Sequence, residues 1–364
     1  MTWWGWVSLV AVLIGIAWAI NAWVLPRLRG KPKKLERKIS GIEDYLCLLV
    51  EYLDGLFQAP PRIRDPFLEA QKLETEYKFP EAIKHYAACL QPETTTSQRA
   101  ALHILIGNCH FHLSELEEAE GHYREAEAAA TQAKDDEGLA AALGNIGLVY
   151  QTEGELDKAL ELYERVFKIE REMGRKWGEA NALGNIGTIY LSQKKLDKAL
   201  DCHQQALKID KKTGYREGQA QDLANIGNIY LSQKEHDKAL DYYQRALKVD
   251  RDIGNREWEA NQLGNIGNIY ADKGELDKAL DFHHRALKIN QGIGRRLEEA
   301  SSLHNIGLVY AEKGETEKAL KHLQQALQIF EEIGAKIEIE KTKQNIQEIV
   351  ERMESSRGTK GDTV

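Results

Sequence analysis

Cysteine is scarce in this chain and forms no paired motif. The four cysteines are Cys47, Cys89, Cys109 and Cys202. No CxxC occurs, and although Cys109 and His112 lie three residues apart, no second ligand pair of that kind accompanies them. The spacing argues against a disulfide framework or a cysteine zinc site. It predicts buried free thiols in a reducing compartment.

A separate catalytic arrangement is also missing. No nucleophile, phosphate-binding loop or carboxylate pair stands apart from the repeated sequence pattern. Four histidines recur near one position of successive units: His203, His283, His284 and His322. Because a metal needs ligands that converge at short range, this spacing predicts no zinc site. We therefore predict no catalytic residue, no metal, no cofactor and no enzymatic activity.

Beyond the first 38 residues, acidic side chains outnumber basic ones. The formal net charge is −8, of which residues 1–38 contribute +6, so the remainder carries −14. Affinity for nucleic acid is driven mainly by Lys and Arg. The charge balance therefore predicts no nucleic-acid binding.

Charged side chains are absent from Thr2 to Leu25, a run dense in Trp, Val, Leu, Ile and Ala. About 20 apolar residues span a bilayer core. The run is long and starts without Lys or Arg, so a transmembrane helix at 2–25 is favoured over a cleaved signal peptide. The basic residues after Pro26 place the rest of the chain in the cytoplasm. These features predict a single-pass membrane protein.

Residues 26–62 are predicted to form a basic juxtamembrane segment followed by an amphipathic connector helix. Apolar residues recur at helical spacing within 39–58. Such a helix would cap the rest of the protein, lie on the membrane, or pair with a second copy. The third alternative would make the protein a homo-oligomer, and the sequence does not choose among the three.

The main feature present is a tripeptide that recurs every forty residues. Asn-Ile-Gly occurs five times, starting at Asn145, Asn185, Asn225, Asn265 and Asn305. Strict self-similarity at a period of 20–50 residues is typical of a solenoid, in which each unit packs on its neighbours.

One unit, residues 180–213, shows the pattern. Leu183, Ile186, Gly187 and Tyr190 fall on one face of a first helix, and apolar residues from 196 to 207 form one face of a second helix. Asp residues recur in the first turn of the second helix, where an acid complements the helix dipole: Asp157, Asp197, Asp237 and Asp277.

Glycines mark the ends of both helices. The turn position held by Lys194 is glycine in other units, namely Gly154, Gly274 and Gly314. A further glycine follows each second helix: Gly174, Gly214, Gly254, Gly294 and Gly334. Glycine suits the left-handed conformation that ends a helix.

The pattern Leu-x-x-Ile-Gly-x-x-Tyr, then Gly, Leu, Ala-Leu and Ala-Leu, resembles the tetratricopeptide repeat. The usual Trp is Leu here, and the closing Pro is absent. The period is forty rather than thirty-four, which makes these repeats similar to those of kinesin light chains and spindle-orientation adaptors. The resemblance implies an all-α, right-handed solenoid of antiparallel helix pairs over 63–339. About seven repeats are expected, at 63–96 (degenerate), 100–133, 140–173, 180–213, 220–253, 260–293 and 300–333. A capping helix at 340–354 and a disordered tail at 355–364 follow.

A column of amides is the candidate binding site. It comprises Asn145, Asn181, Asn185, Gln221, Asn225, Asn228, Asn261, Asn265, Asn268 and Asn305. The resemblance implies that first helices line the concave face and that Asn there binds the backbone of a peptide, to which an amide offers two donors and an acceptor. The alternative is that each amide bonds to the neighbouring repeat's helix and sets the pitch. Small residues beside the column leave space, and His304 breaks that series.

We therefore predict a membrane-anchored cytoplasmic scaffold that binds a protein or peptide client in its concave groove. The alternative function is a structural assembly factor for membrane complexes that acts through the convex face or the connector helix.

Overall fold

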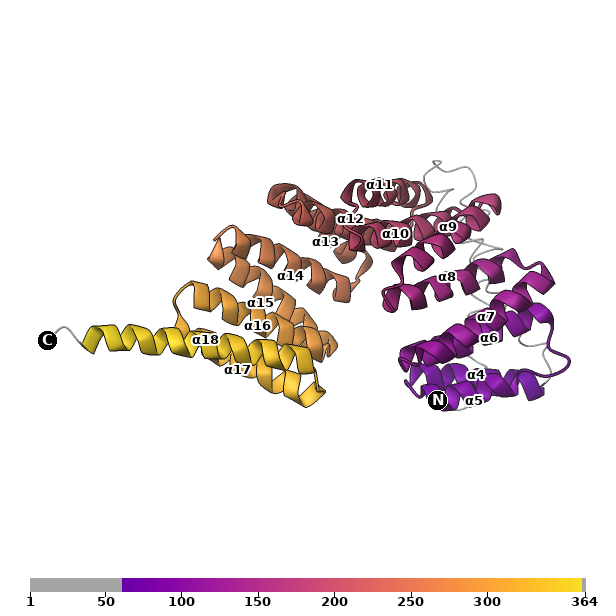
Figure 1. Cartoon of the computed structure of the whole chain (residues 1–364), viewed down its shortest axis with the longest axis horizontal. Coiled ribbons are helices and arrows are strands. Elements are labelled where there is room, and N and C mark those ends of the chain that lie inside the picture. Colours follow the sequence, from indigo (N-terminus) through magenta and orange to yellow (C-terminus); the bar gives the residue numbers. More distant parts are fainter. Residues whose placement is uncertain (1–60, 362–364) are drawn as a thin grey trace, which may run out of the picture. The chain divides into compact units, whose positions relative to one another are not determined.

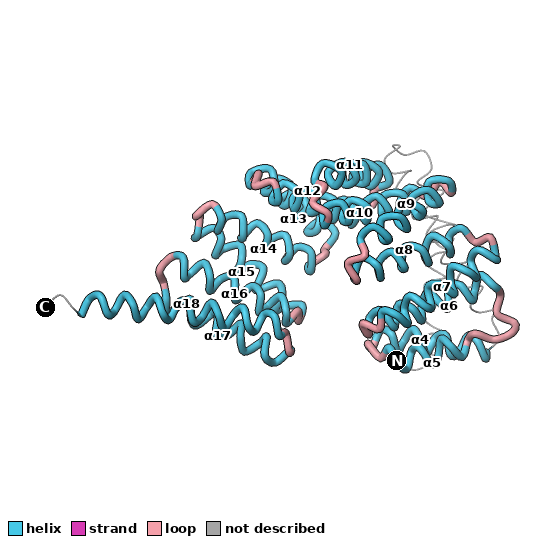
Figure 2. The backbone as a smooth tube through the Cα atoms, viewed as in Figure 1, coloured by secondary structure: helices cyan, strands magenta, loops and turns pink. Residues whose placement is uncertain are grey.

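The structure, a computed structural model, describes residues 61–361. These residues form fifteen α-helices joined by short loops and no strand (Figures 1 and 2). The helices are α4 Pro61–Thr75, α5 Phe79–Ala88, α6 Thr96–His112, α7 Leu116–Ala133, α8 Asp136–Thr152, α9 Leu156–Glu172, α10 Lys176–Ser192, α11 Leu196–Thr213, α12 Arg216–Ser232, α13 His236–Ile253, α14 Arg256–Asp272, α15 Leu276–Ile293, α16 Arg296–Glu312, α17 Thr316–Ile333 and α18 Lys336–Gly361. The predicted all-α helical repeat is confirmed for this part of the chain.

The chain divides into two compact units, and part of α11 belongs to each of them. Among the described residues, the first unit comprises 61–195 and 208–215, and the second comprises 196–207 and 216–361. Each unit has its own buried apolar clusters, as expected when every repeat covers the apolar face of the next.

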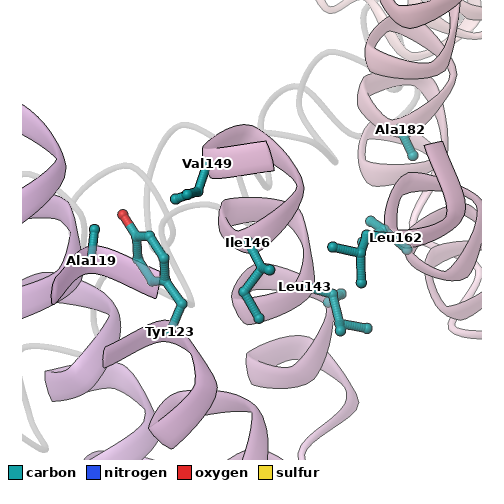
Figure 3. Packing of buried hydrophobic residues seen from close by; sticks show 9 residues of the cluster. Ala119, Tyr123, Leu143, Ile146, Val149, Leu162 and Ala182 are labelled. Carbon is teal, nitrogen blue, oxygen red and sulfur yellow. The ribbon is translucent and has the colours of Figure 1, made fainter. Parts of the chain in front are cut away.

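The core of the first unit is built from the apolar stripes that the repeat pattern predicts. Leu143 and Ile146 of α8 are fully buried and pack with Tyr123 of α7 and Leu162 of α9 (Figure 3). The stripe arises because residues three and four apart share one side of a helix.

The second unit repeats the arrangement forty residues at a time. Tyr243 of α13 packs with Leu263 and Ile266 of α14 and with Ile289 of α15. At the end of the unit, Ile349 of α18 packs against α17. Helix α18 extends to Gly361, into the segment for which a disordered tail was predicted.

Helix ends follow the glycine pattern. The C-caps of α11, α13, α15 and α17 are glycines with φ between 72° and 81°. At the turn between the two helices of a repeat, Gly274 has φ 73°, and Lys194 and Lys234 adopt the same left-handed conformation at φ 57° and 60°. The turn is therefore imposed by the repeat geometry even where no glycine is present.

The repeated Asp in the first turn of the second helix also contacts the next repeat. Gln193 Nε2 donates to Asp157 at 2.9 Å, and Lys273 Nζ donates to Asp237 at 2.6 Å. Each donor is the C-cap residue of the first helix of the following repeat, Gln193 after α10 and Lys273 after α14. The sequence predicted the helix-dipole role and missed this link between repeats.

The described cysteines, Cys89, Cys109 and Cys202, are buried free thiols as predicted. Cys47 lies outside the described residues.

The predicted localisation requires correction. Among residues 61–361, no helix is long and apolar enough to cross a bilayer, so a single-pass membrane protein is not supported. The span predicted at 2–25 and the connector predicted within 26–62 fall on residues before those described, apart from the last two. The buried apolar residues of the described helices pack within and between repeats.

Candidate functional site

The three letters of Asn-Ile-Gly lie in different environments. Ile146, Ile226, Ile266 and Ile306 are fully buried, and the glycines beside them are buried too. The five asparagines are only partly buried. They lie on the first helices of five successive repeats, α8, α10, α12, α14 and α16. The local sequence thus directs Ile and Gly inward and leaves the amide within reach of solvent.

Four of these asparagines have amides without a protein partner. Among the described residues, Asn145, Asn225, Asn265 and Asn305 make no side-chain hydrogen bond. A role in setting the pitch between repeats would require such a bond. Their donors and acceptors are instead available to a ligand or to water.

Other members of the column are engaged within the protein. Asn185 Nδ2 donates to Asn181 Oδ1 at 3.2 Å along α10. Asn261 Oδ1 accepts from Arg295 Nη1 of the following repeat at 3.3 Å. Gln221 and Asn268 are exposed.

Asn228 lies on the packing side of its helix. Its Oδ1 accepts a 2.5 Å hydrogen bond from the Tyr243 hydroxyl of the same repeat. Asn108 and Tyr123 form the equivalent bond at 2.8 Å in an earlier repeat. Burial raises the pKa of Tyr243, so this phenol is a permanent donor at neutral pH. Asn228 therefore joins the two helices of one repeat.

Open space lies beside the column where the sequence has glycine. A Cβ added to Gly144 or Gly264 would meet no atom within 4 Å. At the last repeat His304 takes this position. It is buried, with Nδ1 2.9 Å from Thr342 Oγ1 and Nε2 3.1 Å from Asn345 Nδ2 of α18.

The charge state of His304 follows from its burial. Desolvation and, to a lesser extent, the nearby Lys341 lower its pKa to about 4, so the ring is neutral at physiological pH. It fills the space beside the column and joins α16 to α18. Asn345 lies forty residues after Asn305 and was missed in the sequence, because Gln347 replaces the glycine of the tripeptide.

The amides belong to two separate sets. Asn145, Asn181 and Asn185 lie in the first unit. The second unit holds Gln221, Asn225, Asn228, Asn261, Asn265, Asn268 and Asn305. The second set spans three consecutive first helices.

A family model described as "Tetratricopeptide repeat" matches residues 98–172, 178–252 and 259–332. The chain belongs to the tetratricopeptide repeat family. The match covers the helix pairs that carry the amide column, and the family assignment predicted from the repeat pattern is confirmed.

A curated relative is the Response regulator aspartate phosphatase J of Bacillus subtilis (strain 168). It is 28% identical over 110 residues, which are 29% of this tetratricopeptide repeat chain and 29% of that protein. Since the chain matches less than a third of the relative's length, the activity in that name is not carried over.

Solved structures share the fold. The tetratricopeptide repeat chain matches a STAND signal transduction ATPase with a tetratricopeptide repeat sensor from Pyrococcus horikoshii with a TM-score of 0.65 and 17% identity, covering 88% of this chain and 50% of that one. A Rap protein complexed with competence and sporulation factor matches with a TM-score of 0.59 and 14% identity, over 96% and 99% of the two chains. BtubC from P. vanneervenii matches with a TM-score of 0.53 and 22% identity, covering 61% of this chain and 90% of that one. At these identities the likeness concerns the fold.

Proposed function

We propose that the second unit binds an extended protein segment along α12, α14 and α16, with Asn225, Asn265 and Asn305 holding its backbone. The observation that carries the proposal is the combination of partial exposure and lack of any partner for these three amides among the described residues. An amide left without a partner in a repeated position is a hydrogen-bonding group held ready for a ligand.

The repetition of the amide suits an extended chain. The first helices α12, α14 and α16 each present one asparagine of the tripeptide, and an extended client carries an N–H and a C=O at every residue except proline. The three amides therefore meet the client backbone at regular intervals. Asn225, Asn265 and Asn305 together form a ladder of amides, called here the asparagine ladder. Because each amide contacts N–H and C=O groups that all residues share, this ladder recognises the conformation of the client more than its sequence.

Open space beside the ladder supports the same proposal. A Cβ at Gly264, which precedes Asn265, would touch nothing within 4 Å, so a client backbone has room to approach. In the first unit Asn145 offers the same unpartnered amide, whereas Asn185 donates to Asn181. We propose these three residues as a second set, in which Asn181 and Asn185 use their remaining donors and acceptors.

The likeness to a Rap protein described as complexed with competence and sporulation factor is consistent with a binding role for this fold. It does not name the client of this chain. The competing function is an assembly factor that acts through another face of the helices, and it makes the opposite prediction for the amides.

The test is the triple variant Asn225→Ala, Asn265→Ala, Asn305→Ala in the full chain. A peptide selected from a displayed random library against the wild-type protein would be titrated by fluorescence anisotropy. Each lost hydrogen bond costs about 0.5–1.5 kcal/mol, so the loss of three should lower the affinity by about 10-fold to 2000-fold.

The matched control replaces three exposed amides of second helices in the same forty-residue phase: Gln204→Ala, Gln244→Ala and Gln324→Ala. It should bind as tightly as wild type. If the asparagine variant keeps its affinity, the ladder is idle, and if it unfolds, the amides are structural. Either result contradicts the proposal.

A further inference from the structure

One repeat breaks the pattern that the others keep. In the repeat at 100–133, three histidines replace residues that are apolar or aromatic in the next repeat: His103 for Leu143, His110 for Tyr150 and His122 for Leu162. Leu143 and Leu162 lie side by side in the core shown in Figure 3. A repeat that only needed to pack would not require imidazoles at all three positions.

The three imidazoles converge in space. His103 Nδ1 of α6 lies 3.1 Å from His122 Nδ1 of α7. The His122 ring stacks on both neighbours, with centroids 5.4 Å from the His103 ring and 5.3 Å from the His110 ring. His110 Nδ1 lies 2.6 Å from Glu115 Oε2, which holds its ring in place.

Both rings can be reached from solvent, because His103 and His122 are only partly buried. The neutral form of imidazole is the one that binds metal ions.

We propose that His103 and His122 chelate a late first-row divalent ion, Cu²⁺, Ni²⁺ or Zn²⁺, through their Nδ1 atoms. Two nitrogens about 2.0–2.1 Å from one ion are about 2.9–3.4 Å apart at angles between square-planar and tetrahedral, and the observed separation falls within this range. Imidazole is a preferred ligand of all three ions.

The site is partly buried and has two protein ligands. Among residues 61–361, no group of three or more His, Cys, Asp or Glu side chains is arranged to hold a metal, so water completes the coordination. His110 acts as a positioning residue, since its stacked ring and its Glu115 partner fix the plane of His122.

Binding requires a tautomer change and no net loss of a proton. Without an ion, one Nδ1 carries the hydrogen that bonds to the other. When both Nδ1 lone pairs turn to the ion, that ring carries its proton on Nε2 instead. The formal charge of the two rings stays zero.

The experiment titrates the full chain, free of any histidine tag, with NiCl₂ in a calorimeter. His103→Leu and His122→Leu each restore the residue of the next repeat, so the fold should be kept, as circular dichroism would verify. His284→Gln is the matched control, since Gln244 holds the equivalent position. We expect one saturable site, at least 10-fold weaker in both leucine variants and unchanged in the control.

A second measurement is independent of the variants. Electron paramagnetic resonance of the Cu²⁺-loaded wild-type protein should show hyperfine coupling to two imidazole nitrogens. A spectrum without that coupling, or wild-type affinity no greater than that of His103→Leu, would show that the histidines only pack, and the proposal would be wrong.

Discussion

Gly267 lies directly against the His283 ring: a Cβ added to Gly267 would be 2.8 Å from His283 Cε1. The two residues belong to the first and second helix of one repeat. In another repeat, Gly227 lies in the same way against Tyr243: a Cβ added to Gly227 would be 2.9 Å from Tyr243 Cε1. The glycine of the recurring tripeptide thus allows the two helices to approach until a ring contacts the backbone.

The first prediction concerns this contact. Gly267→Ala should destabilise the protein by about 1–2 kcal/mol, because overpacking outweighs the gain in helix propensity. Gly264→Ala, in the same helix, should stabilise it by about 0.5–1 kcal/mol, since its Cβ meets open space. Urea unfolding followed by circular dichroism measures both. Equal effects of the two substitutions would contradict the close approach.

A second prediction follows from the left-handed lysine at the turn. Lys234 has φ 60°, a conformation that costs a residue with a Cβ about 1–2 kcal/mol. Lys234→Gly should stabilise the protein by about 0.5–1 kcal/mol after the entropy of the glycine is subtracted. Lys248→Gly, within the exposed face of α13, should instead destabilise it by about 1 kcal/mol. A loss of stability in Lys234→Gly would show that its side chain has a role that the backbone argument omits.

A third prediction concerns the buried carboxyl of Asp250. The side chain is 1% exposed, and burial raises its pKa to about 6, with Glu259 adding to the rise and a hydrogen bond with Gln262 opposing it. Because the folded pKa exceeds the unfolded value, its contribution to stability is full below about pH 4. That contribution is lost as the pH rises through 6.

Asp250→Asn removes this dependence, and the equivalent residue forty positions later is already Asn290. The variant should exceed wild type by about 1–3 kcal/mol at pH 8 and match it near pH 4, by urea unfolding at each pH. Asp241→Asn, exposed on the same helix and paired with Arg245 at the surface, is the control for the loss of a carboxylate. Its free energy of unfolding at pH 8 should stay within about 1 kcal/mol of wild type. Parallel pH profiles for wild type and Asp250→Asn would contradict the raised pKa.

A fourth prediction concerns the exposed link between repeats. Lys273 Nζ and Asp237 Oδ1 form an ion pair 2.6 Å apart at the surface, where solvent screens the charges. Lys273→Ala should leave the urea midpoint unchanged within error, in low and in high salt. A clear, salt-dependent loss would mean that these links hold the repeats together.

Much of the fold followed from the period alone. The Ile and Gly positions, the glycine turns and the helix pairs were all predictable, because a residue every third or fourth position defines one face of a helix. The sequence also separated the amides of the column from the buried stripe. It could not show that Asn228 bonds to Tyr243, while the Asn225 amide has no partner among residues 61–361. That difference depends on which side chain the second helix brings opposite.

The sequence by itself determined that this chain forms helix pairs of forty residues with Ile and Gly inside and Asn outside. Only the tertiary structure decided which polar residues are partnered, which carboxyl is buried, and that His103 and His122 meet. The physical reason is that periodicity fixes the direction of a side chain from its own helix. What the side chain meets is set by a neighbouring helix, whose residues are separated from it by about twenty or forty positions.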